Sequence, residues 1–245
     1  MANRLNCRVV LPGESISNFI SGLVSDNFKT VLGPGLQRHS DEIVVTKCGI
    51  LKYKKPNLVW VESHEKRYVP VRGEYVIGII TTKGSEVVRA DIGAGDSAVL
   101  SLLSFEGATK RNKPNLQVGD LVYARVLVAS KDMEPELVCV NSHGKSGELG
   151  VLPSSGFLFT VPLNLVRKIL CPSCPLLKTL GERIPYEITA GANGRVWINA
   201  NTIQNTLLVY NAISFAEHMT PEEVNIMCSE ILHGNQEATL VTMLK

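Results

Sequence analysis

The most constraining feature of this sequence is a succession of five short, strand-like segments between residues 71 and 147. Val88, Ala90 and Ile92 recur at every second position, which is the period expected when one face of a strand is buried. Residues 121–128 are nearly all apolar, as in a strand buried on both faces. The other three segments are residues 76–80, 99–103 and 137–140. Five short strands in this length predict a Greek-key barrel of the OB type.

The regions on either side of the barrel differ from it and divide the chain into three predicted domains. Residues 1–70 contain short apolar stretches separated by Pro and Gly turns, which predicts an N-terminal β-rich domain. Residues 148–245 combine helical spacing with two strands joined by a glycine-rich turn, and they are predicted to be α+β. The predicted fold class is therefore mixed β and α+β, with the barrel domain at 71–147.

Two long runs in the C-terminal part, residues 149–166 and 196–216, contain no charged residue. Prolines interrupt the first run and asparagines recur in the second, so neither is suited to a hydrocarbon environment. The second run also contains a predicted helix. Its apolar stripe consists of Ile203, Leu207, Tyr210 and Ile213. We expect a protein that makes no contact with a membrane.

The overall composition restricts how such a chain could bind nucleic acid. The formal net charge is only +2, whereas a protein that binds RNA through charge alone is usually more basic. RNA contacts would therefore come from local patches or from a surface shared with partners. The six cysteines are too sparse for a disulfide-built fold, and the N-terminal residues do not resemble a secretory leader. We expect reduced thiols in the cytosol or nucleus.

The sequence offers little that could support catalysis. Cys171 and Cys174 form a single CxxC pair, whereas a structural zinc site would need a second pair. Asp132, Glu134 and Glu136 alternate and could hold Mg²⁺, but Pro135 interrupts them and a solvated loop is the alternative. Nucleotide-binding and nucleophile motifs are not found. We predict a non-enzymatic protein without a metal or cofactor.

Two short motifs are candidates for binding or structural roles. Gly191-Ala192-Asn193-Gly194 matches the GxxG of KH domains, which clamps RNA backbone between two helices. Here the motif lies between two predicted strands, and Asn-Gly is a strong hairpin signal. We therefore interpret Gly191, Asn193 and Gly194 as a structural turn, of type I′ with positive φ at both Asn193 and Gly194.

The best candidate for RNA binding is the basic cluster Lys110, Arg111 and Lys113. It lies in the predicted loop between the third and fourth strands of the barrel, and OB folds bind single strands beside such loops. The alternative is a merely solvated loop.

Several segments along the chain together resemble known families. The barrel segments Gly73-Glu-Tyr-Val-Ile-Gly-Ile-Ile, Asp91-Ile-Gly and Leu116-Gln-Val-Gly-Asp-Leu-Val-Tyr-Ala-Arg-Val resemble the S1 RNA-binding domain. The whole chain resembles the ribosomal RNA-processing protein 40 family (exosome component 3), whose members are S1/KH cap subunits of the RNA exosome. The segments that carry this resemblance are Val31-Leu-Gly-Pro-Gly-Leu, Lys66-Arg-Tyr-Val-Pro, Leu103-Ser-Phe-Glu-Gly-Ala-Thr-Lys-Arg-Asn-Lys-Pro and Gly191-Ala-Asn-Gly-Arg-Val-Trp-Ile.

The resemblance implies a central S1 domain followed by a KH-like domain at 148–245. It also implies a non-catalytic subunit that helps to hold a ring of RNase PH-like proteins together. Single-stranded RNA would pass the S1 domains on its way to an associated exoribonuclease. The implied partners are the ring subunits and the other S1/KH cap subunits, in the nucleus, nucleolus and cytoplasm. Lys66 and Arg67, in one of the matching segments, are further candidates for RNA contact.

The sequence departs from the S1 and KH patterns at two places. Residues 84–86 and 99–101 contain neither the aromatic nor the histidine that many S1 domains carry there. Because base stacking contributes about 1–3 kcal/mol per base, we expect weak, largely electrostatic affinity for free RNA. Residues 171–175 lack glycine, which disfavours RNA clamping by the KH-like domain. A free-standing S1-type regulator and a ribonuclease acting alone are the alternative functions.

Overall fold

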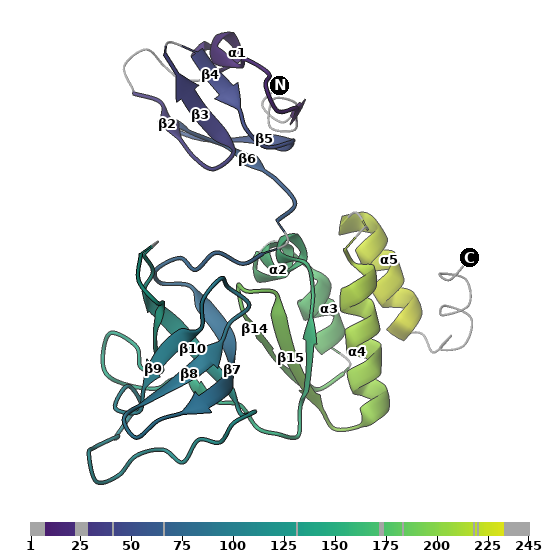
Figure 1. Cartoon of the computed structure of the whole chain (residues 1–245). Helices are drawn as coiled ribbons and strands as arrows, with labels where there is room; N and C mark the ends of the chain where they lie inside the picture. Colours follow the sequence, from purple (N-terminus) through teal and green to yellow (C-terminus); the bar gives the residue numbers. More distant parts are fainter. Residues whose placement is uncertain are drawn as a thin grey trace. The chain divides into compact units, whose positions relative to one another are not determined.

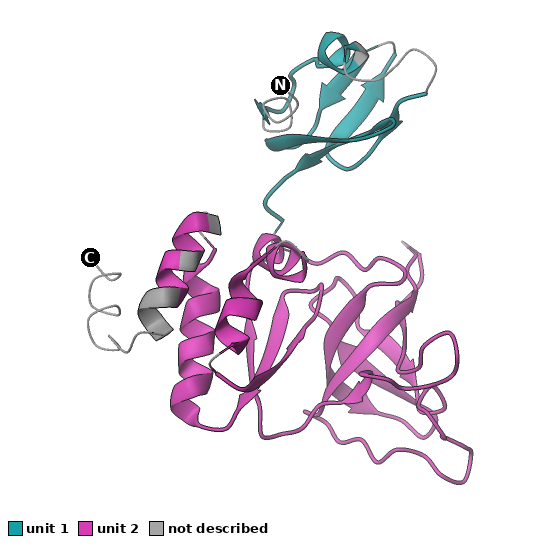
Figure 2. Ribbon diagram, turned by 180° about the vertical axis from the view of Figure 1, so that it is seen from behind, with its two compact units in different colours: residues 1–65 teal, residues 66–245 magenta. Residues whose placement is uncertain are grey.

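The computed structural model describes residues 8–22, 29–40, 42–65, 67–130, 132–171, 174–182, 184–217, 219 and 221–232. The chain forms two compact units, residues 1–65 and 66–245, which Figure 2 shows in different colours. The first unit contains strands and one short helix. The second unit joins a β-barrel to an α+β domain.

The first unit is a four-stranded sheet with an additional hairpin. The order of the sheet is β1 (Arg8–Val10), β5 (Gly49–Lys54), β6 (Leu58–Glu62) and β2 (Val31–Leu32). The hairpin consists of β3 (Leu36–His39) and β4 (Glu42–Val45), and the helix α1 (Ser17–Ser21) lies against β4. Alternate strand residues and the helix share one core: Val10, Ile16, Ile20, Ile43, Val45, Leu51, Val59 and Val61. The prediction of an N-terminal β domain is confirmed.

The second unit begins with a closed barrel of five strands. These are β7 (Tyr75–Lys83), β8 (Val87–Asp91), β9 (Ala98–Ser101), β10 (Leu121–Val128) and β11 (Glu136–Val138). The barrel closes because β11 pairs with β9 on one side and with β10 on the other. β12 (Gly150–Val151) extends the sheet at β10. Val88, Ala90 and Ile92 are fully buried in the barrel core, as the period-two pattern predicted. The predicted OB barrel is confirmed.

The α+β domain follows, and its three-stranded sheet lies between the barrel and the helices (Figure 1). The order of the sheet is β13 (Phe157–Thr160), β15 (Arg195–Ala200) and β14 (Tyr186–Ala190). The helices are α2 (Leu163–Leu170), α3 (Leu176–Gly181), α4 (Ile203–Phe215) and α5 (Pro221–Leu232). One core joins the sheet to the helices through residues such as Phe159, Val196, Leu180 and Ile213. Within the described residues, no helix has both the length and the apolar character needed to cross a membrane.

Helix α4 differs from its sequence-based prediction. Of the stripe Ile203, Leu207, Tyr210 and Ile213, only Ile213 is buried, whereas the side chain of Ile203 is 81% exposed and that of Leu207 is 49% exposed. The helix buries a different face, formed by Val209, Ala212 and Ile213. Apolar residues occur on every side of this helix, so periodicity alone could not determine which face packs against the sheet.

Candidate nucleic-acid interface

The loop between β9 and β10 carries the predicted RNA-binding cluster. Lys110 and Arg111 are exposed, and Lys113 is half-buried. The tip of the loop is a tight turn, because the N–H of Thr109 donates to the carbonyl of Asn112 (2.9 Å) and the N–H of Asn112 donates to Thr109 Oγ1 (3.1 Å). The turn therefore presents two cationic side chains to solvent at a defined place on the barrel.

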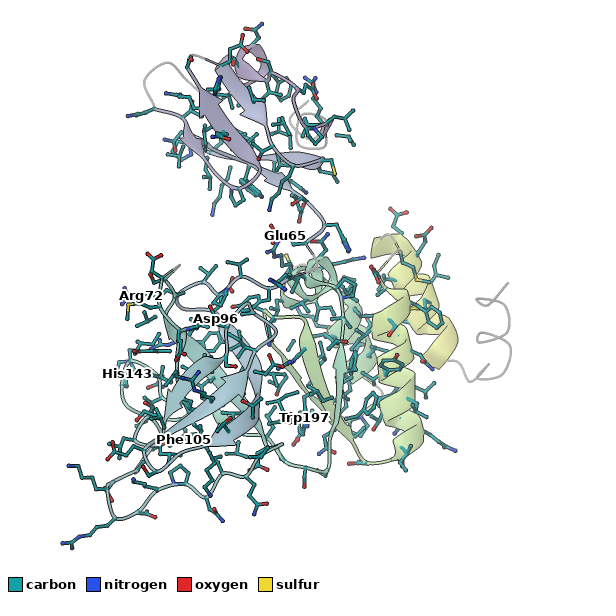
Figure 3. All side chains as sticks on the ribbon, in the orientation of Figure 1. Glu65, Arg72, Asp96, Phe105, His143 and Trp197 are labelled. Atoms are coloured by element: carbon teal, nitrogen blue, oxygen red, sulfur yellow. The ribbon has the colours of Figure 1, made fainter. Side chains whose placement is uncertain are left out.

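The base of this loop is fixed beside the turn that joins β7 to β8. Lys113 Nζ donates to the carbonyl of Ser85 (2.7 Å), and Lys83 Nζ donates to Asn115 Oδ1 (3.1 Å). Leu116 is fully buried, and Phe105 at the other end of the loop packs on the barrel core (Figure 3). OB folds bind single strands at the loop between their first two strands, and the contacts from Lys113 and Lys83 bring the basic loop next to it. Lys83 was not among the predicted RNA-binding residues, although a lysine directly before Gly84 could have indicated a cation at a turn of the barrel.

Glu106, the acidic residue closest in sequence to the basic cluster, is hydrogen-bonded to Ser146. Glu106 Oε2 accepts hydrogen bonds from the N–H of Ser146 (2.7 Å) and from Ser146 Oγ (2.5 Å). These two hydrogen bonds lower the pKa of Glu106 below its ordinary value. The carboxylate ties the loop to residues 141–147 instead of pairing with Lys110 or Arg111, so the cations stay available to an anionic ligand.

The outer face of β8 and β9, where OB folds commonly hold nucleic acid, contains no aromatic side chain. Val87 faces Ser101 and Arg89 faces Val99 across the two strands. Arg89 Nη1 is also paired with Glu134 Oε1 at 2.8 Å. This face offers no ring on which a base could stack, so RNA contacts near it would be mainly electrostatic.

The turn at residues 191–194 has a different conformation from the predicted type I′. Gly194 has a φ of +84°. The φ of Asn193 is not positive, because Ser40 is the only non-glycine residue with positive φ among the described residues. The N–H of Gly194 donates to the carbonyl of Gly191 (3.1 Å), and the N–H of Gly191 donates to the carbonyl of Arg195 (2.9 Å). This is a type I turn followed by a left-handed glycine, the other common way to close a hairpin. The prediction of positive φ at Asn193 was wrong.

Asn193 in this turn completes the edge of a barrel strand. β8 pairs with β7 only as far as Ile79, so the backbone of Ile77 lies beyond the end of β8. Asn193 Nδ2 donates to the carbonyls of Ile77 and Ile92 (both 2.9 Å), and Asn193 Oδ1 accepts from the N–H of Ile77 (3.3 Å). The amide thus takes the place of the missing strand. Asn193 is buried, so RNA cannot reach its side chain in this structure.

Arg195 reinforces the same contact between the two domains. Its guanidinium donates to the carbonyls of Ile77 and Asp91, and Arg195 Nη2 donates to Asp91 Oδ2 (2.5 Å). Burial alone would raise the pKa of Asp91, but the N–H of Gly93 and the Arg195 guanidinium lower it below its ordinary value. Asp91 and Arg195 were not among the predicted site residues, although both lie in segments that carry the family resemblance.

The two glycines of the turn lie against other backbone atoms. A Cβ on Gly191 would come within 2.7 Å of the Ile77 nitrogen, and a Cβ on Gly194 would lie 2.6 Å from the carbonyl oxygen of Val161. Gly191 and Asn193 therefore lie against the barrel, whereas Gly194 lies against the segment between β13 and α2.

The remaining candidates are distributed elsewhere. Arg67 is exposed at the start of the second unit, whereas Lys66 lies outside the described residues. Cys171 and Cys174 flank two residues that are also outside them. No group of three or more His, Cys, Asp or Glu side chains that could hold a metal ion occurs within the part of the chain that the structure describes.

Family models match the chain in three consecutive regions: the mammalian exosome complex component RRP40 N-terminal domain at 8–64, the S1 domain of exosome complex component RRP40 at 68–150, and a KH domain at 156–204. The exosome complex component RRP40 of Homo sapiens is 49% identical over 220 residues, which cover 86% of this chain and 80% of the human protein. This chain belongs to the RRP40 family.

Other members of the RRP40 family are similar over most of the same length. The component of Drosophila melanogaster is 46% identical and covers 91% of this chain, and that of Saccharomyces cerevisiae is 33% identical and covers 83%. Among solved structures, a putative exosome complex RNA-binding protein aligns with a TM-score of 0.56 and 24% identity over 69% of this chain and 98% of its own. At this identity the structural likeness supports the fold alone. The predicted membership and domain order are confirmed.

Proposed function

We propose that this chain is a non-catalytic cap subunit of the RNA exosome, which helps to hold a ring of RNase PH-like subunits together and contributes to the path by which RNA enters. The observation that carries the proposal is membership of the RRP40 family across all three domains. The other S1/KH cap subunits and an associated exoribonuclease are the further partners. The nucleus, nucleolus and cytoplasm are the proposed compartments.

Within this function, the loop at residues 109–113 is the part of the chain that contacts RNA. Its support is the exposure of Lys110 and Arg111 and the contact from Lys113 to the turn between β7 and β8. The strand face lacks aromatic side chains, so affinity of the free chain for RNA is low and depends strongly on salt. Binding becomes significant when other subunits add their own cations around the same strand.

The KH-like domain has a structural role in this proposal. Its GxxG motif lies between strands β14 and β15, and the side chain of Asn193 is hydrogen-bonded to the barrel backbone. A KH domain that clamps RNA keeps this loop open between two helices.

The absence of catalysis is tested directly with the purified chain. Incubation with labelled single-stranded RNA and Mg²⁺, and separately with inorganic phosphate, should leave the RNA intact, because metal-dependent hydrolysis requires a cluster of acids. Adding the chain to an exosome that lacks it should restore processive decay of structured RNA. Shortened RNA that tracks the concentration of the isolated chain would contradict the proposal.

A further inference from the structure

The four-stranded sheet of the first unit has an outer face that points away from its core. Alternate residues of a strand point to opposite sides of the sheet. Leu51, Val59 and Val61 point inward and share a core with α1 and the hairpin β3–β4. Figure 1 shows α1 and this hairpin on the same side of β5 and β6. The alternating residues of β5 and β6 on the outer face are Lys52, Lys54, Leu58, Trp60 and Glu62.

Trp60 lies in the middle of this face. It is half-buried and lies outside the core of the first unit. On one side, Lys52 lies opposite Trp60 on β5 and is paired with Glu62, with 3.3 Å between Nζ and Oε2. On the other side, a Cβ at Gly33 would lie only 2.7 Å from the Cβ of Trp60. Because residue 33 has no side chain, nothing from this position covers Trp60.

Three lysines gather at one end of the same face. Lys54 ends β5 and Lys55 begins the turn to β6, whereas Lys29 lies beside this turn because its carbonyl accepts a hydrogen bond from Asn57 Nδ2. Lys54 is a diagonal neighbour of Trp60, and such neighbours lie about 7–8 Å apart, within reach of long side chains. All three lysines are exposed, and none of them forms an ion pair within the described residues. Their charges therefore remain available to an anionic ligand.

We propose that this face is a second binding site for single-stranded RNA, in which a base stacks on Trp60 and the three lysines bind the adjoining phosphates. The choice of RNA rests on the proposed function, whereas the site rests on contacts within the first unit. Proteins that bind single strands combine a basic surface with aromatic side chains on which bases stack. The barrel face lacks such a ring, and Trp60 supplies one. An acidic protein segment matches the lysines alone, whereas RNA also offers a flat ring to the indole.

Tryptophan fluorescence of the full-length chain tests the stacking contact. The chain has two tryptophans, and Trp197 is only 2% exposed, so a base that quenches the emission acts on Trp60. Oligouridylate at low salt should quench the emission until the site is saturated. Binding is measured in a chain whose three loop cations in the barrel are replaced by Ala, so that the loop does not contribute.

Two substitutions of Trp60 separate the ring from the fold. Trp60→Ala should abolish the quenching and weaken RNA binding at least about fivefold, the smallest effect expected for the loss of one stacked base. Trp60→Phe keeps an aromatic ring and should bind RNA nearly as well as wild type. Each titration is made at a temperature where circular dichroism shows the variant to be folded.

The lysines are tested by the salt dependence of the same binding. Lys54→Ala/Lys55→Ala should flatten the slope of log affinity against log salt by about 1.4, because each phosphate contact of a single strand contributes roughly 0.7. The matched control Arg38→Ala/Lys47→Ala removes two exposed cations in and beside the hairpin β3–β4, and its slope should stay near that of wild type. Trp60→Ala should also leave the slope unchanged, since stacking releases no counterions.

Three results would overturn the inference: quenching that persists in Trp60→Ala, a slope that falls equally in the control variant, or polyglutamate that binds wild type and Trp60→Ala as tightly as RNA binds wild type. The last result would assign the face to an acidic protein. These titrations use the free chain and do not depend on assembly. A chain that enters an exosome but binds no RNA at this face would refute the inference and leave the proposed function intact. A chain that binds RNA here but enters no exosome would refute the proposed function alone.

Discussion

Truncation of Asn193 should separate a structural role of the GxxG turn from a role in RNA binding. Asn193→Ala removes three hydrogen bonds to the barrel backbone, two to Ile77 and one to Ile92. The carbonyl of Ile77 keeps a bond from Arg195 Nη1 at 3.2 Å. The N–H of Ile77 and the carbonyl of Ile92 lose the partner that Asn193 provides. Both groups lie where the barrel meets the KH-like domain, and Ile77 and Ile92 are fully buried.

The size of the effect follows from these two groups. A buried polar group left without a partner costs about 1–3 kcal/mol, so two such groups should lower the unfolding free energy of the variant by about 2–6 kcal/mol. In a unit of this size, each kcal/mol lowers the thermal midpoint by about 2–4 °C. The second unit of Asn193→Ala should therefore melt roughly 4–24 °C below wild type.

The assay is thermal unfolding followed by circular dichroism, with RNA affinity measured in parallel below the transition. Asn201→Ala is the matched control, because Asn201 is exposed and follows β15 directly. It should melt like wild type. RNA affinity of Asn193→Ala should be unchanged at temperatures where the protein is folded. A wild-type midpoint combined with lost RNA binding would refute the structural role and favour an RNA clamp.

Three further predictions use the same structure. Gly194→Val should lower the thermal midpoint by strain of about 1–3 kcal/mol, because φ is +84° and a Cβ would lie 2.6 Å from the Val161 carbonyl oxygen; an unchanged midpoint would contradict the turn geometry. Replacing Lys110, Arg111 and Lys113 with Ala should flatten the salt slope of log affinity of the assembled complex by about 2; an unchanged slope, or a complex that dissociates, would assign these cations to protein contacts. Folding lowers the pKa of Asp91, so the ionised carboxylate stabilises the folded state. This stabilisation is fully present above the pKa that Asp91 has in the unfolded chain, and it is lost as the pH falls through the pKa of the folded state. The difference in thermal midpoint between wild type and Asp91→Asn should shrink on acidification, and a difference independent of pH would exclude the ion pair as its cause.

The elements that sequence predicted well are those fixed by local pattern. Alternation at Val88 and Ala90 identified a barrel strand, because one face of that strand meets the core and the other meets solvent. The helical spacing of Leu163, Val166, Ile169 and Leu170 in the sequence corresponds to α2 in the structure. Its end at Cys171 follows from the proline that comes next in the sequence.

The features that sequence could not predict depend on contacts between distant residues. Asn193 was assigned positive φ from the Asn-Gly pair, but its side chain bonds to Ile77, 116 positions earlier, and this contact favours the type I turn. Lys113 was grouped with two exposed cations, yet its ammonium also holds the loop to Ser85. For α4, apolar residues on every side left the buried face undetermined until β13 and β15 were placed.

Native mass spectrometry of the complex that carries a tagged copy of this chain tests the central claim most directly. The chain itself has a mass of 26.7 kDa. The proposed function predicts that nearly all of it is found in one assembly many times heavier, with a single copy of this chain beside RNase PH-like and other S1/KH subunits. A chain that is found free, or bound to RNA without those subunits, would contradict the claim and favour a free-standing RNA-binding regulator.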